Sequence, residues 1–385
     1  MRDRPVGEVE SMRNCYLCGC ELTDANTTKE HIFLQAIGGR LYSKELLCKT
    51  CNSTVGDTID AALAEQLNVV SNLLDIQRDR GRPPVLRVQE AETGEPLRIA
   101  PGGKPEYVQP KITEEQRDDG IRYHVEASNL RQAREVIRGL KRKHPELDEE
   151  EILRTAKKQE RYMEHMTTLS VGFGGDKAFR SVCKTAVNYY LYTCGSDVAI
   201  AHLVPYIKGE EERRDIVFWA QSIKDPFVRA ADEVSHNIIV RGDAAEGLLY
   251  AYVDFFGAYW TIVVLNRHYD GDDINESYSY DVVSRKSLER SGKIQLGRTQ
   301  VESMAGASPP QEEFHHRLST LVEKIHRKQT REHVRELLDR AVANFVHRHP
   351  DIGEMTQEMC EDLYDETLTQ LMPWIEHAFK ESLIK

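Results

Sequence analysis

Residues 15–52 read CYLCGCELTDANTTKEHIFLQAIGGRLYSKELLCKTCN, and they carry the most specific pattern of the chain. It contains two Cys-x-x-Cys pairs, Cys15 with Cys18 and Cys48 with Cys51. Thiolates bind zinc readily, and each pair turns two sulfur atoms toward one point. The spacing therefore predicts a tetrahedral zinc site. Such a site is coordinatively closed, so the zinc has a structural role and any chemistry needs other residues.

Between the two cysteine pairs lies the tripeptide Glu30-His31-Ile32, and Asn52 follows the second pair directly. Adjacent residues of a strand point to opposite faces, so a kink or a strand end is needed to bring Glu30 and His31 to one metal ion. A lone histidine is more often structural. Inside a zinc-stabilised frame, we favour a functional histidine, with Asn52 as a further metal ligand.

The combination of these motifs with Gly38-Gly39 and Cys51-Asn52-Ser53 resembles the HNH endonuclease family, over about residues 13–66. The resemblance implies a ββα-metal fold, in which two strands and a helix hold one divalent ion. It also implies that four cysteines bind a structural Zn²⁺ in this branch of the family. The expected reaction is hydrolysis of a phosphodiester bond, which leaves a 5′-phosphate and a 3′-hydroxyl.

The resemblance assigns roles to individual residues. His31 matches the general base that activates water, and a neutral imidazole can accept that proton near pH 7. Glu30 and Asn52 match the ligands of a catalytic Mg²⁺ or Mn²⁺, which prefer oxygen donors. Asp57 is a further candidate ligand, and Asp60 lies one turn beyond it, although solvated helix charges are an equally reasonable interpretation.

The chain departs from the family pattern at one position. A middle asparagine, which normally fixes the loop that carries the base, is expected a few residues before the second cysteine pair. Ser43-Lys44-Glu45 occupies that region instead. The orientation of His31 must therefore depend on other contacts.

Composition bounds the class of protein. The chain has 385 residues, with 40% hydrophobic and 30% charged residues, which is typical of a globular protein of two or three domains. No apolar run reaches the ~20 residues of a membrane helix, and the N-terminus resembles no export signal. Cysteines in metal-type spacing suit a reducing cytoplasm, where we expect the protein. The net charge of −12 argues against a sequence-blind nucleic-acid coat, but an enzyme can meet DNA through a local patch.

Hydrophobic periodicity predicts an α+β protein, and the resemblance implies that it begins with the ββα-metal (HNH) unit and its four-cysteine zinc site. A mixed α/β region and a mainly α-helical C-terminal region follow. The expected segments are an HNH domain at 13–76, a strand-containing linker region with helices at 77–166, an α+β module at 167–300 and a helical region at 309–385.

Two further groups of residues allow more than one interpretation. Basic residues near the HNH unit are candidate contacts to nucleic acid, or ordinary solvated charges: Arg40, Lys44, Arg78, Arg80 and Arg82. Aromatic residues between 250 and 260 are able to stack bases, but their alternation favours a place in the core.

These features favour a metal-dependent endonuclease that cuts DNA, with duplex DNA as the expected substrate. The architecture is similar to HNH proteins of prokaryotic restriction and antiphage systems. The resemblance thus implies a tail that senses or recognises, a partner protein of a defence system, and a homo-oligomer. One alternative is a zinc-stabilised module that only binds nucleic acid or a partner. Another is an effector that cuts RNA or is gated by a second messenger.

Overall fold

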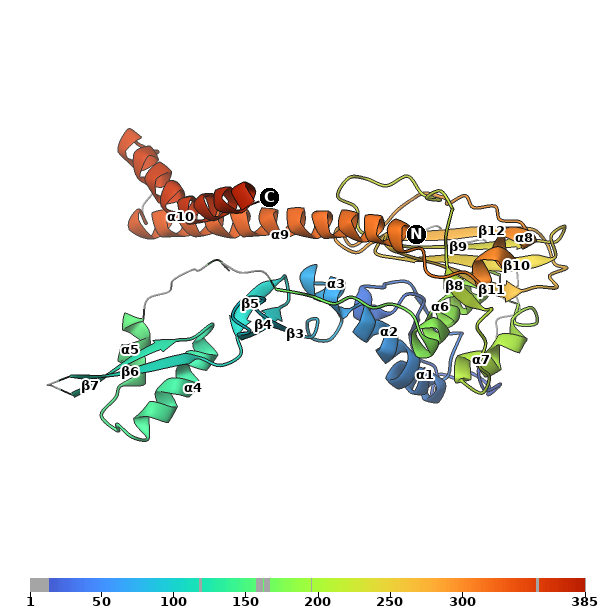
Figure 1. Ribbon diagram of the computed structural model, residues 1–385, viewed down its shortest axis with the longest axis horizontal. Helices are drawn as coiled ribbons and strands as arrows, with labels where there is room; N and C mark the ends of the chain where they lie inside the picture. Colours follow the sequence, from blue (N-terminus) through green and yellow to red (C-terminus); the bar gives the residue numbers. More distant parts are fainter. Residues whose placement is uncertain are drawn as a thin grey trace. The chain divides into compact units, whose positions relative to one another are not determined.

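The computed structural model describes residues 14–117, 120–156, 162, 167–194, 196–350 and 353–384. Helices and strands are mixed along the chain, so the expected α+β class is confirmed. Two compact units form: unit 1 contains residues up to 84 together with 170–328, and unit 2 contains 85–169 and residues from 329 onward (Figure 1). No helix in the described ranges has the length and apolarity needed to cross a membrane.

The N-terminal part of unit 1 is a short antiparallel strand pair followed by helix. Strand β1 is Glu30–His31 and pairs with β2, Tyr42–Ser43. The helical elements are η1 (Gln35–Ile37), α1 (Lys49–Val55), the π-helical turn η2 (Gly56–Asp60), α2 (Ala61–Gln66) and α3 (Asn68–Leu73). The order of two strands and a helix is the ββα arrangement that the sequence predicted.

A six-stranded antiparallel sheet forms the rest of unit 1, in the order β13-β12-β9-β10-β11-β8 (Figure 1). Its strands are β8 (Val217–Trp219), β9 (Ser235–Asp243), β10 (Leu248–Phe255), β11 (Tyr259–Asn266), β12 (Ile274–Asp281) and β13 (Lys286–Ser287). The associated helices are α6 (Asp176–Cys194), η3 (Ala201–Leu203), α7 (Val204–Lys208) and α8 (Arg298–Ala305). Every residue of the central strand β10 is buried, because both faces of the sheet are covered.

Each face of the sheet has its own apolar core. Alternate residues of β10 such as Ala251 and Val253 pack with α6 and with the N-terminal ββα unit. The intervening residues, including Tyr250 and Tyr252, pack on the other face with Val301 and its neighbours in α8. The interpretation of the 250–260 aromatic residues as core is thus confirmed, since all of them are buried.

A buried histidine ties the sheet to the ββα unit. His236 of β9 is fully buried, stacks on Phe33 with ring centroids 5.0 Å apart, and its Nε2 lies 2.9 Å from the carbonyl oxygen of Ile37. Its Nδ1 accepts a hydrogen bond from the backbone N–H of Phe256, so Nε2 carries the proton that is donated to Ile37. Burial lowers the pKa of His236 to about 4.

This histidine makes unit 1 sensitive to acid. The unfolded chain protonates His236 near pH 6.5 and the folded chain only near pH 4, so stability is lost as the pH falls between these values. We expect a loss of about 2 kcal/mol of unfolding free energy between pH 7.5 and pH 5. Denaturant unfolding of wild type and of His236→Gln at both pH values measures this loss of stability. Glutamine is the suitable replacement because it keeps a hydrogen-bond donor for Ile37 but does not titrate. An equal pH dependence in both proteins would show that His236 has no such effect.

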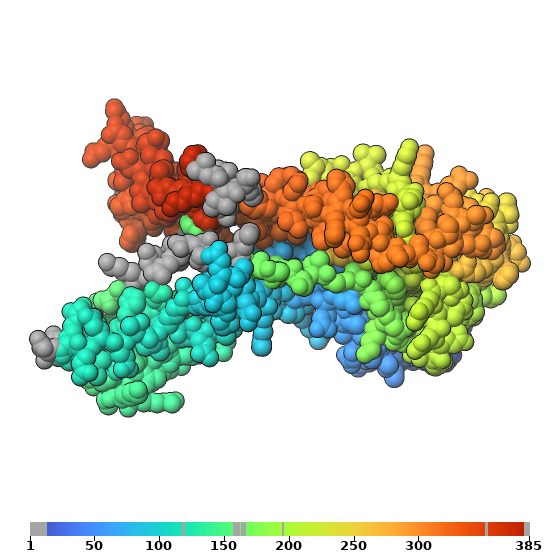
Figure 2. All heavy atoms as spheres, in the orientation of Figure 1, coloured from blue at the N-terminus to red at the C-terminus, as the bar shows by residue number. Residues whose placement is uncertain are grey.

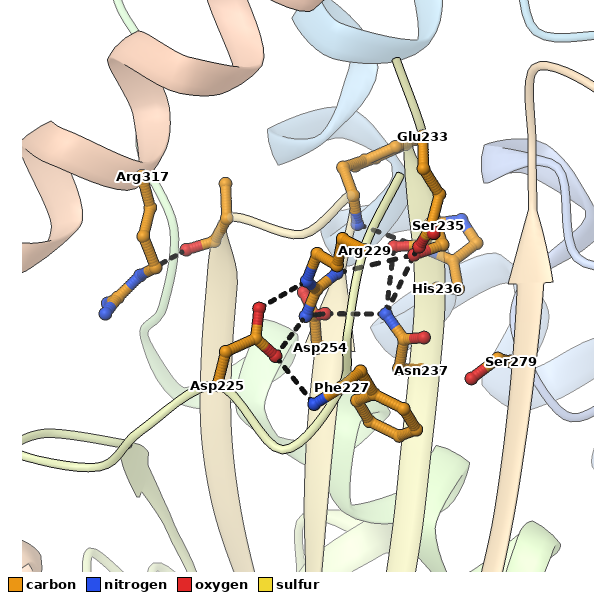
Figure 3. Close-up of polar contacts among 12 residues, drawn as sticks. Asp225, Phe227, Arg229, Glu233, Ser235, His236, Asn237, Asp254, Ser279 and Arg317 are labelled. Carbon is orange, nitrogen blue, oxygen red and sulfur yellow. Dashed lines mark hydrogen bonds and ion pairs between the residues drawn. The ribbon is translucent and has the colours of Figure 1, made fainter. Parts of the chain in front are cut away.

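A network of buried polar side chains lies at one end of strands β9 and β10 (Figure 3). Asp254 is fully buried, and its Oδ2 accepts hydrogen bonds from Arg229 at 2.8 Å and from Asn237 at 2.7 Å. Arg229 also binds Asp225. Glu233 pairs with Arg290 in the same region. These buried charges are compensated by opposite charges, as the low-dielectric interior requires, so the network holds the loop 221–234 on the sheet.

Unit 2 contains short sheets and helices. Its strands are β3 (Leu86–Gln89), β4 (Pro96–Ala100), β5 (Lys104–Tyr107), β6 (Lys111–Arg117) and β7 (Gly120–Glu126). Its helices are α4 (Leu130–Lys141), α5 (Glu149–Thr155), the end of α9 (Gln311–Arg348) and α10 (Gln357–Ile384). The C-terminal region is helical, as the sequence predicted.

The boundaries of the compact units differ from the segments expected from the sequence. Segments 13–76 and 167–300 belong to one unit, because α6 packs directly on the ββα helices (Figure 2, blue against green). From Ser181 to Leu191, every residue of α6 is buried. A helix buried on all sides needs partners on all sides, and the ββα unit and the sheet supply them.

Candidate active site

The loop between β1 and β2 is closed by two glycines. Gly38 has a φ of 99°, a left-handed conformation that favours glycine. At Gly39, a side-chain Cβ would lie 1.9 Å from the carbonyl oxygen of Phe33, so only glycine fits. The loop returns the chain so that His31 pairs with Tyr42 across the strands. This pairing fixes the backbone of His31 in a chain that lacks the middle asparagine of the family.

The four cysteines of the two pairs gather at one point. Their Sγ atoms all lie within 4.8 Å of one another, and those of Cys18 and Cys48 are 3.8 Å apart. A tetrahedral zinc ion with Zn–S bonds of about 2.3 Å requires sulfur atoms about 3.8 Å apart. A hydrogen bond from the backbone of Cys20 is the main cause that lowers the pKa of the Cys18 thiol to about 6. The donor set and spacing therefore fit a structural zinc ion.

Glu30, His31 and Asn52 line one cavity of about 210 Å³. The other polar residues of its wall are Lys29, Gln35, Asp60 and Lys184. The structure thus brings together the three residues that the sequence singled out for chemistry. Asp57 is exposed and is not part of the cavity wall, whereas Asp60 is.

Side chains of helix α6 hold Glu30 in place through hydrogen bonds. It is buried, and its Oε1 accepts hydrogen bonds from Lys184 Nζ at 2.5 Å and from Asn188 Nδ2 at 2.7 Å. Asn188 is in turn oriented by the hydroxyl of Tyr16, which donates to its Oδ1 at 2.8 Å. Both bonds to Glu30 use one carboxylate oxygen, so Oε2 is available to a ligand in the cavity.

Lys184 also binds Asp60. The distance from Nζ to Asp60 Oδ2 is 2.6 Å, and Ser181 donates to the other oxygen, Oδ1, at 2.6 Å. Burial alone lowers the pKa of Lys184, but Glu30 and Asp60 outweigh it and raise that pKa above its usual value, so the lysine is charged. Burial raises the pKa of Glu30, and Lys184 opposes that shift.

His31 and Asn52 complete the cavity. Burial lowers the pKa of His31, which favours the neutral imidazole that a general base needs. The Asn52 side chain donates from Nδ2 to the carbonyl oxygen of Lys29 at 3.2 Å, which leaves Oδ1 for a cation. A carboxylate oxygen and an amide oxygen on one cavity wall are ligands that Mg²⁺ and Mn²⁺ accept, so the residues fit a divalent ion.

The basic candidates differ in their surroundings. Arg40 pairs with Asp79, and Arg82 pairs with Asp75, so their charges are partly compensated within the protein. Lys44 and Arg80 are exposed. Arg78 is half-buried, and burial lowers its pKa.

Sequence reasoning missed the contribution of α6 to this cavity. The apolar residues between 179 and 193 recur at helical spacing and predict the helix, but Lys184, Asn188 and Ser181 are not among the candidate site residues. A signal existed: Ser181, Lys184 and Asn188 recur at steps of three and four, so polar residues form a second stripe on the helix. Such a stripe is also typical of a helix face exposed to solvent, so the pattern alone does not identify a polar partner.

Comparison with protein families identifies the first part of the chain. The family model described as HNH endonuclease matches residues 15–68, which include the four cysteines, Glu30, His31 and Asn52. This segment is therefore similar to HNH endonuclease domains. Comparison with curated proteins and with solved structures gave no match for the chain.

Proposed function

We propose that the protein is a metal-dependent endonuclease that hydrolyses phosphodiester bonds of DNA. The observation that carries the proposal is the single cavity lined by Glu30, His31 and Asn52, beside a four-cysteine cluster and within a segment matched by the HNH family. A nuclease needs a base, oxygen ligands for a cation and room for a phosphate, and this cavity supplies all three.

In this proposal, each side chain has one task. His31 accepts a proton from the attacking water. Glu30 and Asn52 would hold the divalent ion, and Lys184 and Asn188 hold Glu30 in place through hydrogen bonds. The ion, when bound, stabilises negative charge on the phosphate and on the leaving 3′-oxygen. The four-cysteine zinc site would hold the strands and the helix of the ββα unit in place.

A substrate screen tests the proposed activity. Zinc-loaded protein is incubated with duplex DNA, single-stranded DNA or RNA, with Mg²⁺, Mn²⁺ or no added divalent ion. We expect cleavage of DNA only with the added ion, and fragments that a DNA ligase can rejoin because they carry 5′-phosphates. Salt competes with basic side chains for the phosphates of DNA, so the reaction should weaken as salt rises. Cleavage of RNA alone would replace the DNA assignment with the RNA-cutting alternative.

The binding-module alternative is favoured by one observation. Lys184 already compensates the charge of Glu30, and a compensated carboxylate attracts a divalent ion less strongly. This alternative predicts retained binding of nucleic acid without cleavage under any metal condition. The same screen, read by gel shift and by product formation, separates the two functions.

A further inference from the structure

The ammonium group of Lys184 lies between two carboxylates at the wall of the cavity. Its Nζ is 2.5 Å from Glu30 Oε1 and 2.6 Å from Asp60 Oδ2. The lysine side chain is 1% exposed, Glu30 is 3% exposed and Asp60 is 13% exposed. Two carboxylates so close and so poorly solvated need a cation, because their mutual repulsion and desolvation both oppose ionisation.

The distances from Nζ to the two carboxylate oxygens are hydrogen-bond distances, and they are only slightly longer than those around a coordinated divalent ion. Oxygen ligands surround Ca²⁺ at about 2.3–2.6 Å and Mg²⁺ at about 2.0–2.1 Å, so a small shift would let a divalent ion take the place of Nζ. Nucleases that use two ions hold them about 3.5–4 Å apart with carboxylates between them. Glu30 is suited to such bridging, since Oε1 faces Lys184 and Oε2 is available on the cavity side.

We propose that Lys184 is a tethered cation that fills the position between Glu30 and Asp60, where a second divalent ion would otherwise bind, and so keeps the nuclease cavity a one-ion site. Helix α6 engages both oxygens of Asp60, through Ser181 and Lys184. Only Glu30 Oε2 and Asn52 Oδ1 then serve the catalytic ion. The inference rests on the proposed function for the role of that first ion.

The α6 helix is therefore part of the active site. Lys184 lies 154 residues beyond Glu30, and apolar residues of its helix pack in the same core as the sheet. Lys184 is a positioning residue, since it acts through Glu30 and Asp60. A fragment that contains only the ββα unit would lack this cation.

Substitution of Lys184 by alanine tests the inference, because alanine leaves room for an ion. Zinc-loaded wild type and Lys184→Ala are compared in chelator-free buffer, by isothermal titration with Mn²⁺ and by thermal unfolding. We expect one Mn²⁺ per chain in wild type and two in Lys184→Ala. At a hundredfold excess over Kd, the additional ion should raise the Tm of the variant by about 5 °C more than in wild type.

The double variant Asp60→Asn/Lys184→Ala is the matched control. It leaves the same room for an ion as Lys184→Ala but has only one of the two carboxylates. It should therefore bind one Mn²⁺ and show the thermal shift of wild type. The proposal is overturned if Lys184→Ala binds no more Mn²⁺ than wild type or the double variant. The proposal is also overturned if Lys184→Ala folds neither with nor without Mn²⁺, because the ion should replace the ammonium group.

The two proposals fail in distinguishable ways. If wild type binds one Mn²⁺ and cuts DNA but Lys184→Ala binds no additional ion, the nuclease assignment stands and the proposed role of Lys184 is wrong. If wild type neither binds Mn²⁺ nor cuts DNA but Lys184→Ala gains one ion, the role of Lys184 as a tethered cation stands and the nuclease assignment is wrong.

Discussion

His31→Ala should reduce the rate of DNA cleavage by about 100- to 10,000-fold, the range that a positioned general base contributes. Among the described residues, His31 is the only imidazole of the cavity wall, and the other residues of that wall are poorer bases at neutral pH. Initial rates on a supercoiled plasmid with Mn²⁺, measured at several protein concentrations, give the ratio to wild type.

Two controls separate a catalytic role of His31 from a structural one. His124→Ala removes an exposed histidine of β7, in unit 2, and should cut at the wild-type rate. Mn²⁺ affinity and Tm of His31→Ala should stay close to those of wild type, because the main contact of the half-buried His31 ring is an aromatic one with Tyr42. Cleavage by His31→Ala at the wild-type rate would remove His31 from the mechanism.

Cys48→Ser should release the zinc ion and unfold the ββα unit. Structural zinc in small domains contributes about 10–16 kcal/mol of apparent binding free energy, which exceeds the stability of most domains. Zinc content by atomic absorption and the thermal unfolding curve measure the two effects. We expect the zinc content to fall from one ion per chain to nearly none, with a parallel loss of cleavage.

Cys20→Ser is the matched control for zinc binding. Cys20 lies two residues after Cys18, but its sulfur is not part of the four-sulfur cluster. The variant should keep its zinc and its Tm. Loss of zinc from Cys20→Ser, together with its retention in Cys48→Ser, would mean that the ligand set is different from the one the structure indicates.

The zinc site and the order of two strands and a helix could be predicted from the sequence because the residues that form them are close together in the chain. Cysteine spacing, the Glu30-His31 dipeptide and the closing glycines all lie within one short stretch, and the structure places them as the motif suggests. The apolar runs at 237–241, 248–255 and 259–265 also predict strands, and they form β9, β10 and β11.

The contribution of α6 and the association of the ββα unit with the sheet could not be predicted in the same way. Lys184 meets Glu30 only after the chain has folded back over 154 positions, and the hydrogen bond between His236 and Ile37 spans 199. Hydrophobic periodicity shows that α6 is amphipathic but does not identify its partner. Asp60, and not Asp57, lines the cavity because η2 is a π-helical turn, which changes the direction of successive side chains.

The most direct test of the central claim is a crystal of the zinc-loaded protein soaked in Mn²⁺, measured on both sides of the manganese absorption edge. We expect one manganese peak in the cavity, in contact with Glu30 and Asn52, while zinc occupies the four-cysteine cluster. A cavity without manganese at saturating Mn²⁺, or with a manganese ion between Glu30 and Asp60 in place of Lys184, would contradict the account of a one-ion nuclease site.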